Sequence, residues 1–307
     1  MTFTQSDALK LGKEPLVSVV MNCYNSAKYL RESIDSVLAQ TYKNWEIIFW
    51  DNQSTDESAK VFLSYADERF HYYLAPEFTK LGLARNLAVA QAKGDWLGFL
   101  DCDDMWLPAK LEQQLDIVIH ESSDLGLVYG QCLVIKGDSE VKTGWAKRQY
   151  KYGNKTNLKA LPEGWILQKI LKLNFIPLLT AIVASDVYHQ VGGISPHFEQ
   201  AEDYELFVKI SATKKVRAVQ DVVALYRVHS SNISHGNEEK NFSECIEIVG
   251  RFLPDPIAKA GLHCQHTIHA IILAKNGNLI SGLLHFIMFG SFLELYMLIY
   301  KKITRKL

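Results

Sequence analysis

The sequence predicts an α/β protein in which a mostly parallel sheet is flanked by helices. The first half of the 307-residue chain alternates short apolar runs with amphipathic stretches, a pattern typical of βα units. Polar residues follow the apolar runs, as expected where a ligand binds beyond the carboxyl ends of the strands in an open sheet. Hydrophobic residues make up 48% of the chain and charged residues 22%, which excludes general disorder.

Four brief apolar segments, rich in β-branched and aromatic residues, predict the strands of this sheet. These predicted strands cover residues 16–21, 45–50, 70–74 and 96–100. The amphipathic segments between them predict helices over residues 29–40, 55–65 and 83–92. The polar residues at the strand ends read Asn22-Cys23-Tyr24-Asn25, Asp51-Asn52-Gln53-Ser54 and Asp101-Cys102-Asp103-Asp104.

The second half of the chain is less regular and is expected to complete the sheet and one wall of a cleft. Its predicted strands cover residues 127–135, 179–183 and 216–225, and its predicted helices cover residues 162–173 and 201–212. Beyond residue 238 the pattern is helical, and it ends in the apolar stretch 279–300 followed by Lys301, Lys302, Arg305 and Lys306. We therefore predict a sheet domain over residues 1–235 and a helical C-terminal region over residues 236–307.

Charge and cysteine content narrow the class of protein. The 33 Lys and Arg against 34 Asp and Glu give a formal charge of -1, so no global positive field is present to hold a nucleic acid. The five cysteines are far apart without a C-x-x-C pair, which predicts neither a disulfide framework nor a zinc ribbon. No charged start leads into an apolar run at the N-terminus, so we expect no secretory signal and a cytoplasmic location.

The strongest chemical signal is the acidic run of Asp101, Asp103 and Asp104 directly after the fourth predicted strand. Carboxylates placed together repel one another unless a cation or hydrogen-bond donors meet them. Hard oxygen ligands suit Mg²⁺ or Mn²⁺ that carries phosphate groups, so the run predicts a metal–diphosphate site. A solvated acidic turn, with Asp104 near a helix start, is the alternative.

Two further residues are candidates for nucleotide contacts. Asp51 ends the second predicted strand and could accept a hydrogen bond from a base, although residues 52–56 equally suit a turn and a helix N-cap. Arg85 lies one turn into a predicted helix and could reach a phosphate or a base. Taken alone, it would more often be a surface arginine.

Together these motifs resemble the family 2 glycosyltransferases of the GT-A fold. The resemblance covers residues 15–234 and rests on residues 17–25, 51–56, 82–86, 94–95, 101–104, 202–203 and 226–229. It implies an inverting enzyme that moves a sugar from a nucleoside diphosphate sugar, expected to be a UDP-sugar, to an acceptor hydroxyl with Mn²⁺ or Mg²⁺. The implied acceptor is a glycan or lipid-linked glycan in bacterial surface-glycan synthesis (lipopolysaccharide, capsule or O-antigen). Asn22 in place of Thr or Pro, and Asn52-Gln53 in place of Asp-Gly, depart from the common pattern.

The resemblance also implies roles for single residues. The implied nucleotide-binding residues are Asn22, Tyr24, Asn25, Asp51, Arg85, Asp101 and Cys102. Asp103 and His229 are the implied metal ligands, supported by Asp104. An attacking hydroxyl must lose its proton to a carboxylate on the acceptor side; Asp203 matches this base and Glu202 is its rival. Without the resemblance, this pair would be an acidic first turn that stabilises a helix.

The apolar stretch 279–300 is close to the ~20 residues that a membrane span needs. His285 and Glu294 would be costly in lipid, so we expect either a helix on the membrane surface with the basic tail on anionic headgroups, or a helix that packs on the domain or between protomers of a homodimer. His263, His266 and His269 recur at helical spacing, and we interpret them as a polar helix face rather than a zinc site.

Two other classes of function are alternatives. A nucleotidyltransferase could use the same sheet and metal carboxylates, but the Gly-rich basic phosphate loop expected near the first strand is absent from the sequence. A non-catalytic nucleotide-sugar-binding protein would lack a base, so Glu202 and Asp203 argue against it.

Overall fold

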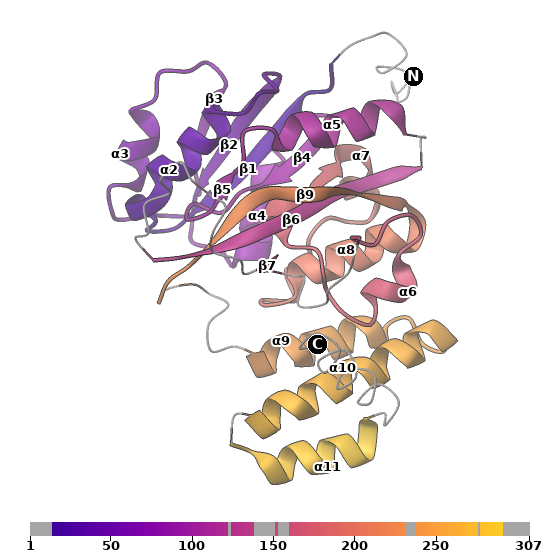
Figure 1. The fold of residues 1–307 in the computed structure, drawn as a ribbon. Coiled ribbons are helices and arrows are strands. Elements are labelled where there is room, and N and C mark those ends of the chain that lie inside the picture. Colours follow the sequence, from indigo (N-terminus) through magenta and orange to yellow (C-terminus); the bar gives the residue numbers. More distant parts are fainter. Residues whose placement is uncertain are drawn as a thin grey trace.

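A computed structural model of the protein describes residues 14–121, 124–137, 151–152, 160–230, 232, 238–275 and 277–290. In this part of the chain, one mixed sheet of nine strands runs through the centre and helices cover its faces (Figure 1). The strand order is β3-β2-β1-β4-β8-β6-β9-β5, with β7 paired to β6. The predicted α/β class is confirmed, and the sheet is more mixed than the sequence predicted.

The parallel half of the sheet follows the prediction closely. Its strands are β1 (Val17–Cys23), β2 (Trp45–Asp51), β3 (Phe70–Leu74) and β4 (Trp96–Phe99), paired in parallel as β3-β2-β1-β4. The connecting helices are α2 (Ala27–Leu38), α3 (Ser58–Leu63) and α4 (Leu81–Val89). Every residue of β2 is buried, as expected for a parallel strand covered by helices on both faces.

The second half of the sheet adds antiparallel neighbours. Its elements are β5 (Met105–Trp106), α5 (Lys110–His120), β6 (Leu125–Lys136), β7 (Lys151–Tyr152), α6 (Leu167–Ile170), the 3₁₀ turn η1 (Leu178–Thr180), β8 (Ile182–Ala184), α7 (Ser185–Gln190), α8 (Glu202–Thr213) and β9 (Lys215–Val228). Strand β8 runs antiparallel to β4 and β6, β5 runs antiparallel to β9, and β6 and β9 are parallel.

Three helices differ from the prediction. The helix expected over residues 162–173 is only the single turn α6, because Gly164 has a φ of 83° and its backbone pairs with Val216 of β9. Helices α5 and α7 were not predicted, although the buried Leu111, Leu115 and Val118 of α5 repeat at helical spacing.

The C-terminal helices α9 (Glu238–Gly250), α10 (Pro256–Lys275) and α11 (Leu279–Phe289) lie below the sheet in Figure 1, with α9 next to α8. Cys245, Ile248 and Val249 of α9, and Ala258 of α10, belong to the same hydrophobic cluster as the strands. The C-terminal helices are therefore packed against the sheet domain. The boundary predicted between residues 235 and 236 lies outside the described residues.

Helix α11 packs on α10 through Gly282, whose position leaves no room for a Cβ beside Ala270 and Ala274. His266 and His285 contact each other between these helices, with 3.0 Å from Nδ1 to Nε2, and burial lowers the pKa of His266 to about 4. The opposite face of α11 is apolar and exposed. Among the described residues, no helix has the length and apolar character needed to cross a membrane. The rest of the predicted apolar stretch and the four basic residues lie outside the described residues.

Candidate active site

The carboxyl ends of β1, β2 and β4 bring the three predicted polar segments together. The backbone N–H of Asn52 donates to the carbonyl oxygen of Cys23 at 2.8 Å, which joins the first two segments. The buried thiol of Cys102 donates to the carbonyl oxygen of Asn22 at 3.3 Å, which joins the first and third. The buried amide nitrogen of Asn22 has no hydrogen-bond partner in the part of the chain that the structure describes. This edge of the sheet therefore offers an unused donor.

Asp51 is buried and firmly held. One carboxylate oxygen accepts the backbone N–H of Ser54 at 2.7 Å, and the other accepts the hydroxyl of Tyr72 at 2.7 Å. Each carboxylate oxygen has a further lone pair that a nucleotide base could use. Asn25, with a left-handed φ of 51°, accepts the backbone N–H of Thr55 at 2.8 Å and so fixes the neighbouring loop.

Two aromatic side chains are exposed on the surface next to this region. Tyr24 is 51% exposed, Phe78 is 59% exposed, and their ring centroids lie 4.8 Å apart in an edge-to-face arrangement. Asn52 fixes the loop that carries Phe78, because its side-chain amide exchanges hydrogen bonds with the backbone of Thr79 at 2.8 and 3.1 Å. Phe78 was not among the residues predicted for the site. An isolated phenylalanine gives no sign of exposure, and its neighbour Tyr24 is distant in sequence.

The acidic run divides into exposed and buried members. Asp103 is partly exposed, and its Oδ2 lies 2.8 Å from Nε2 of His229 and 3.3 Å from the side-chain nitrogen of Asn232. Burial raises the pKa of Asp103, and the charge of Asp101 raises it further. Asp104 is fully enclosed, so burial raises its pKa well above the usual range.

Arg227 connects β9 to the acidic run. Its backbone N–H donates to Oδ1 of Asp104 at 2.8 Å, and its Nε donates to the carbonyl oxygen of Asp103 at 3.0 Å. The buried guanidinium also donates to Glu32 at 2.8 Å and lies 4.4 Å from the ring centroid of Tyr29. Arg227 belongs to one of the motifs in the sequence, but no role was predicted for it.

The donor set fits a cation that arrives with phosphate groups. Within the described ranges, no group of three or more His, Cys, Asp or Glu side chains could hold a metal ion by itself. Asp103 and His229 nevertheless offer one hard oxygen and one imidazole nitrogen side by side. Mg²⁺ and Mn²⁺ are commonly bound by one or two side chains, with phosphate oxygens and waters as the remaining ligands.

Arg85 joins the acidic run to the second acidic pair. It is buried, and its Nη2 donates to Oδ1 of Asp101 at 3.0 Å while its Nη1 donates to Oε1 of Glu202 at 2.6 Å. Helix α8 begins at Glu202 and carries Asp203 in its first turn. The structure thus brings the two predicted acidic groups into one site, linked by a single guanidinium.

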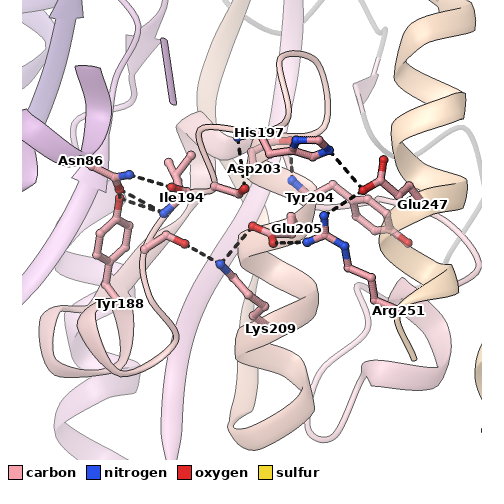
Figure 2. A network of polar contacts seen from close by, with 12 residues as sticks. Asn86, Tyr188, Ile194, His197, Asp203, Tyr204, Glu205, Lys209, Glu247 and Arg251 are labelled. Atoms are coloured by element: carbon pink, nitrogen blue, oxygen red, sulfur yellow. Dashed lines mark hydrogen bonds and ion pairs between the residues drawn. The ribbon is translucent and has the colours of Figure 1, made fainter. Parts of the chain in front are cut away.

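The two members of the second pair differ in their surroundings. Glu202 is buried and ion-paired with Arg85. Asp203 is partly exposed, has no ion pair with any described residue, and accepts the backbone N–H of Tyr204 at 2.6 Å. Burial raises the pKa of Asp203 to about 7, and the charge of Glu202 adds to this rise. Figure 2 shows Asp203 at the start of α8, beside the polar network around Glu205.

Comparison with known proteins agrees with this geometry. The model of the family described as "Glycosyl transferase family 2" matches residues 18–166. The Escherichia coli protein "UDP-Glc:alpha-D-GlcNAc-diphosphoundecaprenol beta-1,3-glucosyltransferase WfgD" is 30% identical over 247 residues, which cover 80% of this chain and 89% of that protein.

Two solved structures share the fold. S. aureus TarS 1-349 in complex with UDP-GlcNAc has a TM-score of 0.61 and 18% identity, covering 86% of this chain and 73% of that one. The mannosyltransferase PcManGT from Pyrobaculum calidifontis, in complex with GDP-Man and Mn²⁺, has a TM-score of 0.62 and 18% identity, covering 96% of this chain and 81% of that one. The chain therefore belongs to glycosyltransferase family 2 and has the GT-A fold.

Proposed function

We propose that this glycosyltransferase moves a sugar from a UDP-sugar to a hydroxyl of a lipid-linked glycan during synthesis of a bacterial surface glycan, with inversion at the anomeric carbon. The observation that carries the proposal is Arg85, which binds Asp101 at 3.0 Å and Glu202 at 2.6 Å. Asp101 belongs to the proposed nucleotide site, and Glu202 is next to Asp203, the proposed base. This guanidinium therefore joins the two halves of the proposed active site. The name of WfgD, with a UDP-Glc donor and an alpha-D-GlcNAc-diphosphoundecaprenol acceptor, supports the choice of substrates.

The donor nucleotide would lie at the edge formed by β1, β2 and β4. Tyr24 and Phe78 offer exposed rings beside the base, Asp51 offers an acceptor for a base N–H, and Asn22 offers its unused amide donor. Asp103 and His229 would hold Mn²⁺ or Mg²⁺. When bound, the cation would offset the charge of the diphosphate.

The proposed base is Asp203. In a single displacement, the acceptor hydroxyl attacks the anomeric carbon opposite the leaving diphosphate and must give up its proton. Asp203 is partly exposed and its pKa is about 7, so a large fraction of its carboxyl groups is ionised at neutral pH. Glu202 suits this role less well because Arg85 already occupies it.

The exposed face of α11 is the proposed contact with a membrane surface. Six large apolar side chains of this helix are between 53% and 78% exposed: Leu279, Ile280, Leu283, Leu284, Ile287 and Met288. Clustered apolar exposure of this kind is typical of a surface that docks elsewhere. The four basic residues near the end of the sequence favour anionic headgroups as the partner, and a second copy of the chain is the alternative.

A panel of nucleotide sugars with Mn²⁺ tests the proposed reaction without an acceptor. Slow hydrolysis of a UDP-sugar, with UDP and free sugar as products, is the expected result. Release of pyrophosphate in the presence of a sugar phosphate and UTP would instead identify a nucleotidyltransferase. Tight binding of a nucleotide sugar without turnover, either with water or with lipid-linked acceptors, would identify a non-catalytic binding protein.

A further inference from the structure

Helix α9 directs a carboxylate at the segment that leads into the proposed catalytic turn. Glu244 is 9% exposed, and its Oε2 accepts the backbone N–H groups of Gln200 at 2.8 Å and Ala201 at 2.9 Å. The backbone N–H of Glu199 is shared between both oxygens, at 3.1 and 3.2 Å. Successive N–H groups that converge in this way form a concavity that holds an anion. Here the anion is a side chain from another helix.

The start of α8 depends on this outside partner. Ala201 stands at the N-cap of the helix and its side chain makes no capping hydrogen bond, although Asp203 accepts the N–H of Tyr204 within the first turn. The side chain of alanine has no oxygen that could accept a hydrogen bond from the free N–H groups of a helix start. The chain that enters Glu202 and Asp203 is therefore fixed by Glu244 rather than by a local cap.

Other side chains of α9 hold the same segment. Lys240 is paired with Glu199, and the side-chain amide of Asn241 donates to the carbonyl oxygen of Gln200 at 3.4 Å. Further along, Arg251 binds Glu205 of α8 at 3.1 Å, and Figure 2 shows its guanidinium between Glu205 and Glu247. Lys240, Asn241 and Glu244 of α9 thus hold the segment before α8, and Arg251, directly after α9, binds the first turn of α8.

We propose that Glu244 is a positioning residue for glycosyl transfer, which fixes the turn that carries Asp203 so that this carboxylate meets the acceptor hydroxyl. The inference rests on the proposed role of Asp203 as the base. Glu244 acts through the backbone of residues 199–201 and lies outside the residues 18–166 that the family model matches.

Removing this carboxylate should affect the rate more than the binding of the donor. Without it, three converging N–H groups lose their partner, and the turn must shift to find another. A displacement of about 1 Å of a reacting group can cost ~100-fold in rate. The donor site is built from β1, β2 and β4 and is not part of this turn.

The test uses the full-length protein with Mn²⁺ and the UDP-sugar that it hydrolyses. For Glu244→Ala we expect kcat to fall by ~10- to 100-fold, while the donor KM and the affinity for UDP with Mn²⁺ stay within about twofold of the wild type. Glu244→Gln should recover part of the rate, because its oxygen can still accept from Gln200 and Ala201 while its NH₂ group faces the N–H of Glu199. Glu239→Ala, at an exposed site in the first turn of α9, is the matched control and should leave kcat unchanged.

A double-mutant cycle separates this inference from the proposed function. If Glu244 acts through the base, adding Glu244→Ala to Asp203→Asn should cause no further loss of rate. A full additional loss, or a raised donor KM with unchanged kcat in the single variant, would overturn the positioning role. An active Asp203→Asn variant would refute the proposed base, whereas an inactive one together with a fully active Glu244→Ala would refute only the inference. Should Glu244→Ala not fold, the same cycle with Glu244→Gln decides the question.

Discussion

The two acidic pairs of the site, Asp103–Asp104 and Glu202–Asp203, share one plan. In each pair one carboxylate is buried and bound by an arginine: Asp104 accepts the backbone N–H of Arg227, and Glu202 accepts Nη1 of Arg85. The other carboxylate of each pair is partly exposed. Each pair therefore has one member that holds the structure and one that is available to a ligand.

The available members differ in what surrounds them. Asp103 lies beside the imidazole of His229 and the amide of Asn232, and an oxygen next to an imidazole nitrogen suits a cation that carries phosphates. The side chain of Asp203 accepts the backbone N–H of Tyr204 and has no ion pair with any described residue, and its pKa is about 7. The difference supports the proposed roles, a metal ligand for the first carboxylate and a base for the second.

The largest effect is expected from a substitution of Asp203, the proposed base. Asp203→Asn should lower the rate of UDP-sugar hydrolysis or transfer by ~10²- to 10⁴-fold, the usual contribution of a general base. Donor affinity should stay nearly unchanged, because the proposed base acts on the acceptor hydroxyl. Steady-state kinetics beside Glu202→Gln provide the measurement. Near wild-type transfer in Asp203→Asn, together with an inactive Glu202→Gln, would exchange the two roles.

The next largest effect is expected for Asp103, the proposed metal ligand, and concerns the affinity for UDP. Without a cation, the carboxylate of Asp103 and the phosphates repel each other, so UDP affinity should depend on Mn²⁺ and Asp103→Asn should reduce it to the level seen with EDTA. Isothermal calorimetry of UDP with Mn²⁺ and with EDTA measures this. Equal affinities of the wild-type protein in the two titrations would show that the first pair does not serve a metal.

A smaller effect, on the pH profile, sharpens the comparison further. A base works only when it is ionised, so kcat/KM should rise with pH up to a pKa of about 7 for Asp203 and then level off. The charged groups that face Asp203 are Glu202 and Asp101, which raise its pKa, and Arg85, which lowers it. Glu202→Gln removes one negative charge and leaves Arg85 less compensated, so the rise should move to lower pH. A profile that moves to higher pH or does not move would contradict this account.

Particular residues show how much of the fold and of the candidate site can be predicted from the sequence. Short apolar runs and their polar ends were enough to predict β1 to β4 and the edge of the site. Residues that join distant segments were out of reach: Arg85 meets Glu202 across 117 positions, and Arg227 meets Asp104 across 123. The contact of Glu244 with residues 199–201 could not be predicted either, because a glutamate in the middle of an amphipathic helix is usually a solvated surface residue. Such partners are selected by packing, which no local pattern records.

The smallest effect on chemistry is expected from the apolar face of α11, which contributes no residue to either acidic pair. Charged substitutions at Ile280 and Ile287, for example Ile280→Asp with Ile287→Asp, should leave donor hydrolysis unchanged. They should weaken binding to phosphatidylserine vesicles in a sedimentation assay, because apolar burial and headgroup attraction act together at a membrane surface. Ser281→Asp, at an exposed polar position of the same helix, is the control for added charge alone.

Two further measurements, the lipid and salt dependence of vesicle binding and the oligomeric state, decide what covers α11. Membrane docking predicts that binding of the wild-type protein rises with the fraction of anionic lipid and falls with salt, since headgroup attraction is screened within about 8 Å at physiological ionic strength. Docking of a second copy predicts instead that the wild type is a dimer by light scattering, that the double variant is a monomer, and that lipid composition has no influence. Helix α11 contributes no residue to either acidic pair, so neither kind of docking should change donor hydrolysis. If donor hydrolysis falls in the α11 variants, this helix supports the acidic pairs.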